Sequence, residues 1–337
     1  MDEVTVTRTN RLVTIFGGSG FLGRYVAREL ARRGWRIRIA TRRPDLAFHT
    51  QPSGRVGQIN AVQANLRYPE SILPALQNAD AVVNLVAILR EQGGQSFDAV
   101  NHLGARAVAE AVKAAGIESF VHVSALGADP ESPSHYARSK AAGEAAVLEN
   151  TPNAVILRPS VVFGPEDKFF NRFAAMARLM PALPLIGGGK TKLQPVYVGD
   201  VAEAVALALD GNAVAGAPYE LGGPQAVSLA DIIRFVLRVT ERRRLLVPLP
   251  FALASLLGGV TELAMKASLG LFPELFALTR DEVALLRRDN IVSEKAHMEQ
   301  RTLESFGIMP ESFQSQAPAY ITRYRKTGGF TDQQLVL

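Results

Sequence analysis

The sequence predicts an α/β fold, a doubly wound parallel sheet followed by a smaller, mostly helical C-terminal part. Three observations predict it. An apolar run near the N-terminus leads through a glycine-rich turn into a helical repeat, strand-like and helix-like segments then alternate to about residue 164, and beyond this point prolines and glycines gather as the alternation weakens. We therefore expect one domain over residues 1–165 and a second over residues 166–337, interleaved with the first rather than joined by a linker.

The individual elements follow from local patterns. Residues 12–16 (LVTIF) are mostly apolar and end at a pair of glycines, as expected of a buried strand, and residues 21–34 have helical spacing with a glycine stop at Gly34. The later strands are expected at 36–41, 62–66, 80–87, 119–125 and 153–164, and the helices between them at 97–116 and 136–150. No internal repeat or low-complexity tract interrupts them.

A glycine-rich stretch, FGGSGFLG, lies between the first strand and the first helix. Gly17, Gly18, Gly20 and Gly23 let the chain turn sharply, approach a pyrophosphate and pack the helix on the strand, while the helix N-terminus offers backbone donors. Its position in the first strand–helix unit predicts a Rossmann-like dinucleotide site. The cofactor-binding residues expected here are Gly17, Gly18, Ser19, Gly20, Phe21, Leu22 and Gly23.

The end of the second strand indicates which dinucleotide binds. NAD sites place an acid about 20 residues past the glycines, whereas this chain has Arg42 and Arg43, with Asp45 only after Pro44. Arginine presents paired donors to phosphate oxygens, so the pair matches the 2′-phosphate of NADP(H). A solvated basic loop end is the alternative.

Tyr136 and Lys140 lie four residues apart in SHYARSK, on one face of an expected helix. With the glycine loop, this spacing resembles the Tyr-x-x-x-Lys element of the short-chain dehydrogenase/reductase superfamily. The resemblance implies that Lys140 binds the nicotinamide ribose and lowers the Tyr136 pKa, so that Tyr136 exchanges a proton with substrate. It implies further cofactor contacts at Asn65, Leu66, Val86, Ala87, Ile88, Ser124, Pro159, Ser160 and Val161.

One member of the catalytic set is missing from this pattern. Active relatives carry a serine or threonine one or two residues after Ser124, and here those positions are Ala125 and Leu126. Because this hydroxyl orients the reacting oxygen, Tyr136 and Lys140 are expected to hold the nucleotide, and turnover by this chain is in doubt.

Several longer sequence segments resemble those of a narrower family, the nucleotide-binding accessory subunits of respiratory complex I. Among them are TIFGGSGFLGRYV, RPSVVFGPEDKFFNRFA and LQPVYVGDVAEAV. That resemblance implies tightly bound NADPH away from the electron path, a structural role where the peripheral arm meets the membrane arm, and other complex I subunits as partners. The alternative is an active NADP(H)-dependent reductase or epimerase acting on a nucleotide-sugar or an isoprenoid- or quinone-related substrate, with Tyr136 as acid/base. The substrate cannot be named from the sequence.

The composition and the first residues of the chain limit the classes of binding partner and the location that we expect. Lys and Arg number 37 against 32 Asp and Glu, but they are scattered and aromatics are 7%, so we expect no nucleic acid and favour an anionic ligand or membrane surface. The sequence has no cysteine, and its five histidines lack metal-ligand spacing, so no metal site is predicted. Because the first residues read as neither signal peptide nor presequence, we expect a peripheral protein on the cytoplasmic side of a bacterial inner membrane.

Residues 245–278 form an unusually apolar run whose only charges are Glu262, Lys266 and Glu274. Two interpretations stay open: a buried helical subdomain, or a surface that lies against a membrane or an apolar partner. Directly after it, Thr279 and Glu282 have the spacing of a capping box that opens a helix.

Overall fold

A computed structural model describes residues 11–268 and 272–328, and the chain divides into two compact units. The first comprises Met1–Pro159, Val198–Leu221 and Ser293–Ile308, and the second comprises the segments between and after these. The sequence placed one boundary after residue 165. The units instead divide at residues 159 and 160, and the chain returns to the first unit twice.

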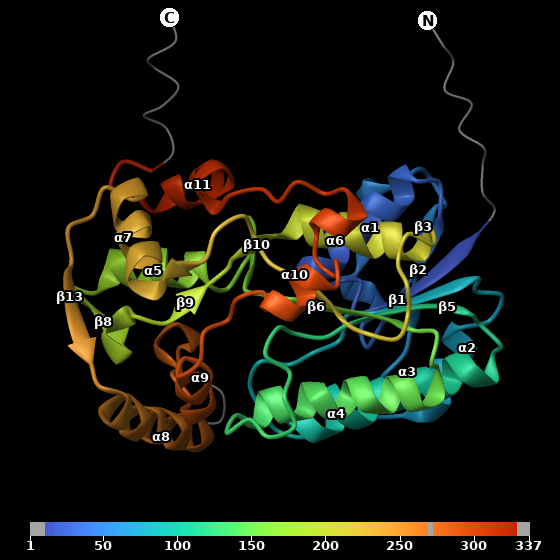
Figure 1. Cartoon of the computed structure of the whole chain (residues 1–337), viewed down its shortest axis with the longest axis horizontal. Coiled ribbons are helices and arrows are strands. Elements are labelled where there is room, and N and C mark those ends of the chain that lie inside the picture. The colour runs from blue at the N-terminus through green and yellow to red at the C-terminus, as the bar shows by residue number, and fades with distance from the viewer. Residues whose placement is uncertain (1–10, 269–271, 329–337) are drawn as a thin grey trace, which may run out of the picture. The chain divides into compact units, whose positions relative to one another are not determined.

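The first unit is built on a seven-stranded parallel sheet (Figure 1) with the order β11-β6-β5-β4-β1-β2-β3. This confirms the predicted doubly wound, Rossmann-like α/β fold. The strands are β1 (Leu12–Phe16), β2 (Arg36–Thr41), β3 (Ile59–Gln63), β4 (Ala81–Asn84), β5 (Ser119–Val123), β6 (Val155–Pro159) and β11 (Tyr219–Leu221).

Several strand predictions were wrong in their limits: those at 80–87 and 119–125 ran past the ends of β4 and β5 at Asn84 and Val123, and two others differ more. The third strand begins at Ile59 rather than at residue 62, because Ile59 pairs with Ile37, and the chain leaves the sheet at Ala64. The predicted strand 153–164 is two strands. β6 ends at Pro159 within the large sheet, whereas β7 (Val162–Phe163) pairs with β10 (Val196–Tyr197) in the second unit.

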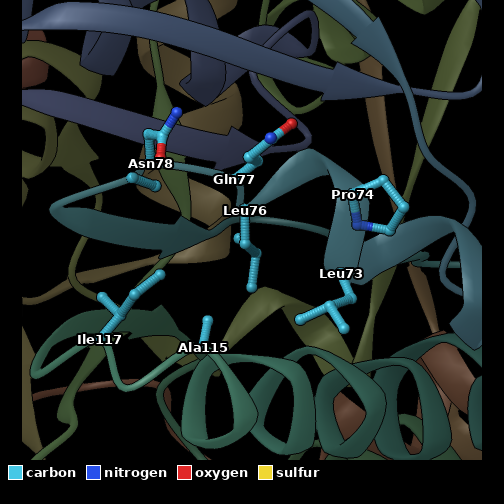
Figure 2. Close-up of a pocket in the computed structure, with 8 residues that line it drawn as sticks. Leu73, Pro74, Leu76, Gln77, Asn78, Ala115 and Ile117 are labelled. Atoms are coloured by element: carbon cyan, nitrogen blue, oxygen red, sulfur yellow. The ribbon is translucent and has the colours of Figure 1, made fainter.

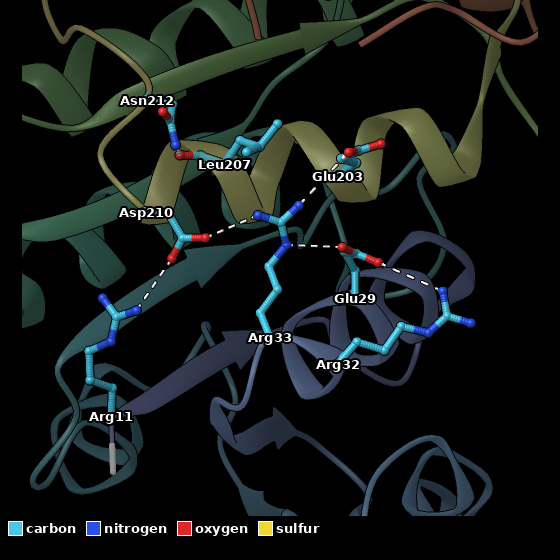
Figure 3. Close-up of polar contacts among 8 residues, drawn as sticks. All are labelled: Arg11, Glu29, Arg32, Arg33, Glu203, Leu207, Asp210 and Asn212. Carbon is cyan, nitrogen blue, oxygen red and sulfur yellow. Dashed lines mark hydrogen bonds and ion pairs between the residues drawn. The ribbon is translucent and has the colours of Figure 1, made fainter. Parts of the chain in front are cut away.

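Helices cover both faces of the large sheet, with α1 and α6 on one face and α3 and α4 on the other (Figure 1). Arg33, at the end of α1, links α1 to α6. Its guanidinium donates to Glu29 in α1 at 2.9 Å and to Asp210, just after α6, at 3.1 Å (Figure 3). A π-helical turn opens the predicted helix 97–116. The helices of this unit are α1 (Phe21–Arg32), α2 (Ile72–Ala75), α3 (Leu103–Ala114), α4 (His135–Asn150), α6 (Val198–Leu209) and α10 (Glu294–Met298).

The second unit combines small sheets with helices around an aromatic core. Its ring contacts join Phe163 to Phe170, Phe170 to Phe313 and Phe313 to Phe235. Besides β7 and β10, its strand pairs are β8 (Ala182–Ile186) with β13 (Leu245–Leu249) and β9 (Lys192–Leu193) with β12 (Val227–Ser228). The helices are α5 (Phe170–Leu179), α7 (Leu229–Val239), α8 (Phe251–Ala267), α9 (Arg280–Leu285), α11 (Phe313–Gln316) and α12 (Pro318–Ile321).

The apolar run at residues 245–278 forms β13, α8 and the approach to α9. In α8 only Ala254 and Gly258 are buried, so the buried-subdomain interpretation is wrong for this helix. Residues 269–271 of the run lie outside the described residues. The capping box is confirmed, since Thr279 and Glu282 exchange hydrogen bonds at the start of α9. Within the described residues, no helix has both the length and the apolar character needed to cross a membrane.

Candidate nucleotide-binding site

A cavity of about 370 Å³ opens in the first unit at the carboxyl ends of β1 to β4. This edge is where parallel α/β sheets bind their ligands, because the loops after successive strands meet there. Twelve of the sequence-predicted residues line it: Gly17, Ser19, Gly20, Phe21, Leu22, Gly23, Arg42, Asn65, Leu66, Val86, Ala87 and Ile88.

The glycine loop has the shape that a pyrophosphate requires. Gly17 has φ +79°, and a Cβ on it would lie 3.2 Å from Val86. Gly23 packs so closely that a Cβ would lie 2.3 Å from the Gly17 carbonyl oxygen. No side chain caps the start of α1, and its first turn carries no acid, so its amides and its positive dipole end face the cavity unscreened. The loop therefore fits a dinucleotide.

The two predicted arginines have different positions. Arg42 lines the cavity, and its Nη1 donates to Gln95 Oε1 at 3.0 Å. Arg43 does not line it, because its guanidinium turns to Asp45 with bonds of 2.7 and 3.0 Å and is two-thirds exposed. Sequence reasoning missed Arg67, which lines the cavity and donates to the Gly94 carbonyl at 3.2 Å. The only signal for Arg67 was its place just after Asn65 at the end of the third strand.

Tyr136 and Lys140 lie on α4, outside the cavity lining. Ser134 caps this helix by accepting the amide of Ala137. Lys140 is almost fully buried, its Nζ donates to the Val123 carbonyl at 3.0 Å, and burial lowers the pKa of its amine to about 8. The Tyr136 ring meets Phe97 edge to face at 5.8 Å. This bond fixes the Lys140 amine of α4 at the carboxyl end of β5.

The remaining predicted residues also lie away from the lining. Ser124 is buried, and its Oγ has no hydrogen-bond partner among the described residues. Pro159 ends β6, where its carbonyl accepts the amide of Leu126. Gly18 is packed against Ile39. Ser160 and Val161 belong to the second unit, where Ser160 Oγ donates to Asn290.

Asn101 is a second residue that sequence reasoning missed. Its Oδ1 accepts the amide of Ile88 at 3.0 Å, and its Nδ2 donates to Ser139 Oγ on α4 at 3.1 Å. The side chain therefore fixes one wall of the cavity to the helix that carries Tyr136 and Lys140. It is a positioning residue. The sequence signal was weak, because a single asparagine in an apolar helix start carries no spacing information.

Asn84 and His122 hold the Val86 end of the same wall. Asn84 Oδ1 accepts the amide of Val86 at 3.1 Å, which leaves its Nδ2 to donate to His122 Nδ1 at 3.2 Å. His122 is 1% exposed, and within residues 11–268 and 272–328 its Nε2 has no hydrogen-bond partner. Burial, helped by the charge of Lys140, holds the pKa of His122 well below its ordinary value.

His122 predicts a loss of stability in acid. Below pH 6.5 the unfolded chain takes up a proton that the folded chain refuses, so unfolding is favoured by up to about 1.4 kcal/mol per pH unit. His122→Leu should remove this part of the slope in urea denaturation at pH 5 to 7. The matched change at exposed His297, His297→Leu, should keep it. Equal slopes in both variants would contradict the assignment.

A second hollow lies at the opposite edge of the sheet (Figure 2). It measures about 580 Å³ and is lined by Leu73, Pro74, Leu76, Gln77, Asn78, Ala79, Ala115 and Ile117, near the amino ends of β4 and β5. None of these side chains titrates, so the hollow offers no acid or base. Within the described residues, no cluster of His, Cys, Asp or Glu could hold a metal ion.

The sequence pattern of the NAD dependent epimerase/dehydratase family matches residues 13–222, and the chain belongs to this family. Membership of this family supports a nicotinamide nucleotide as the cofactor. Two solved structures share the fold: UDP-glucose 4-epimerase of Thermus thermophilus in complex with NAD (TM-score 0.63, 21% identity, 94% of this chain and 99% of that one) and dTDP-glucose 4,6-dehydratase of Bacillus anthracis with NAD (TM-score 0.67, 17% identity, 93% and 96%).

Among curated proteins, the chain is homologous to a mitochondrial complex I subunit, "NADH dehydrogenase [ubiquinone] 1 alpha subcomplex subunit 9". It is 35% identical to the Arabidopsis thaliana protein over 94% of this chain and 79% of that one, and 34% identical to the Mus musculus protein over 93% and 80%. A ceramide reductase of Caulobacter vibrioides is 35% identical over 58% of this chain and 60% of its own length.

Proposed function

We propose that this protein is an accessory subunit of respiratory complex I, NADH:quinone oxidoreductase, which binds NADPH tightly and supports assembly where the peripheral arm meets the membrane arm. The observation that carries the proposal lies just after β5. There, Ala125 and Leu126 occupy the positions of the hydroxyl that would orient a reacting oxygen, while the nucleotide-binding glycine loop is complete. The homology to subunit 9 over nearly the whole chain supports the complex I part.

The choice of NADP(H) over NAD(H) rests on the charges that line the cavity. Arg42 and Arg67 both reach its lining, and each donates to the short loop at Gly94 and Gln95. Two guanidiniums beside the ribose end of a dinucleotide suit a 2′-phosphate, which offers several charged acceptors. The proposal thus replaces the predicted pair of Arg42 and Arg43 by Arg42 and Arg67.

The location forms part of the same proposal. We place the protein at the membrane periphery, on the cytoplasmic side of a bacterial inner membrane, where complex I presents its peripheral arm. Support comes from the exposed apolar residues of α8, which a subunit without an attachment surface would not retain.

An active reductase is the second candidate. Lys140, with its pKa lowered to about 8, lies one helical turn from Tyr136, as an acid/base pair would. The likeness to a ceramide reductase over part of the chain also favours it. In this role Tyr136 would exchange a proton with the substrate of an NADP(H)-dependent reaction.

Nucleotide retention separates the two candidates. We expect the purified protein to keep NADPH through gel filtration, to melt at clearly higher temperature with NADPH, and to leave its absorbance unchanged with quinones, nucleotide-sugars or long-chain ketones. A ligand at a hundredfold excess over its Kd adds about 2.7 kcal/mol to stability. Steady NADPH oxidation with one of these compounds that is lost in Tyr136→Phe would establish the reductase instead.

A further inference from the structure

Helix α8 has an inner face that packs on α9, beside it in Figure 1. Ala254 and Gly258 are buried there, and a Cβ on Gly258 would lie 2.9 Å from the amide nitrogen of Arg280. Thr261, the next residue on this face, donates to the carbonyl of Leu278. The spacing of 254, 258 and 261 is helical, so the orientation of α8 about its own axis is fixed.

The outer face of α8 is an apolar stripe with nothing packed over it among the described residues. Its five large side chains are exposed by 43 to 69%: Leu253, Leu256, Leu257, Val260 and Leu263. Their spacing of three, four, seven and ten residues places them along one side of the helix for almost three turns. Single exposed leucines are ordinary, but a continuous stripe of this kind marks a binding surface.

Cations border this stripe. Arg280 lies against Gly259 in the middle of α8, and Lys266 is exposed in its last turn, whereas Arg287 lies over the Phe251 ring at 5.1 Å on the inner side of the helix. Glu262, the acid on the helix, is bound to the backbone amide of Arg280 at 2.7 Å. The border therefore presents positive charge beside the middle and the last turn of the stripe.

The charge of the whole unit agrees with this border. The second unit has 17 Lys and Arg against 11 Asp and Glu, whereas the first has 20 against 21. The entire basic excess of the chain thus belongs to the unit that carries α8. A second copy of the chain would bring the same positive border against itself, which disfavours a symmetric dimer through this stripe.

We propose that α8 lies in the plane of an anionic phospholipid bilayer, with Leu253, Leu256, Leu257, Val260 and Leu263 inserted among the acyl chains near the headgroups. An in-plane helix needs an apolar face and a cationic flank whose aliphatic stems reach from the apolar layer to the phosphates, and α8 with Arg280 and Lys266 supplies both. This inference names α8 as the surface through which the membrane attachment proposed above occurs. It is independent of the nucleotide cavity.

Vesicle flotation of the full-length NADPH-loaded protein tests this surface. We expect binding to vesicles that contain phosphatidylglycerol and much weaker binding to phosphatidylcholine alone, with salt reducing the first. Leu256→Glu and Leu263→Glu should each lower binding at least tenfold, because each replaces a leucine inserted in the bilayer by a charged side chain that stays in water. Exchanging Lys266 and Arg280 for Gln should lower binding to anionic vesicles about fivefold per cation.

Leu73→Glu is the matched control, because Leu73 is half exposed in the first unit, and it should leave vesicle binding unchanged. NADPH affinity and thermal melting should be unaltered in all the α8 variants, so failure of this surface is separable from failure of the nucleotide proposal. Absence of vesicle binding by the unmutated protein would overturn the lipid assignment. If Leu256→Glu then still released the chain from native membranes, the stripe would bind a protein instead.

Discussion

Replacing Arg42 and Arg67 together by alanine is expected to weaken NADPH binding by two to four orders of magnitude and to leave NADH binding nearly unchanged. Both guanidiniums line the cavity, and a charge-assisted contact to phosphate contributes about 1.5 to 3 kcal/mol. NADH lacks the 2′-phosphate and so loses nothing of this kind. Calorimetric titration of both nucleotides into the double and single variants measures the effect.

Arg43→Ala is the matched control for this experiment. Arg43 follows Arg42 directly but is paired with Asp45 and lies outside the cavity lining, so its removal should change NADPH affinity less than either of the other changes. Equal NADPH and NADH affinities in the unmutated protein would contradict the NADP(H) proposal. An effect of Arg43→Ala as large as that of Arg67→Ala would contradict the assignment of the clamp to Arg42 and Arg67.

Gly23→Ala is expected to abolish nucleotide binding. The added Cβ would lie 2.3 Å from the Gly17 carbonyl oxygen and 2.6 Å from backbone atoms of Gly18, so the loop and α1 must move apart. Overpacking of this kind costs about 1 to 3 kcal/mol, and it displaces the amides that face the pyrophosphate. Melting curves with and without NADPH should show lower stability and no stabilisation by the nucleotide.

Gly20→Ala, in the same loop, serves for comparison. The nearest atom to its added Cβ is the Gly17 carbonyl oxygen at 3.3 Å, so only a small adjustment is needed and nucleotide binding should persist in weakened form. If Gly23→Ala bound NADPH as well as Gly20→Ala, the close approach of α1 to the loop would have no role in binding.

The parts of the site that sequence predicted are those with a local signal. Glycines between an apolar strand and a helix carry a conformational requirement in themselves, and residues 17–23 line the cavity apart from Gly18. Arg67 comes from the loop after β3 and Asn101 from the π-helical turn before α3, and their roles depend on which segments the sheet brings together. Nothing in the spacing of the residues around them shows this.

The same reason explains the errors in the fold. β11 has three residues, too few for a periodic pattern, and β6 and β7 read as one strand because the chain crosses between units without a turn signal. For α8, an apolar run looks alike whether it is buried or exposed. Exposure became visible only when Ala254 and Gly258, the small residues, proved to face α9 and the leucines to face away.

The central claim is that this chain is a subunit of complex I rather than a free enzyme, and native electrophoresis of the source membranes tests it most directly. Membranes solubilised in mild detergent would be separated, stained for NADH:quinone oxidoreductase activity and probed for this chain and for bound NADPH. The account predicts that the chain migrates with the active band and brings NADPH with it. Recovery of the chain wholly apart from that band, with oxidoreductase activity unchanged after its removal, would contradict the claim.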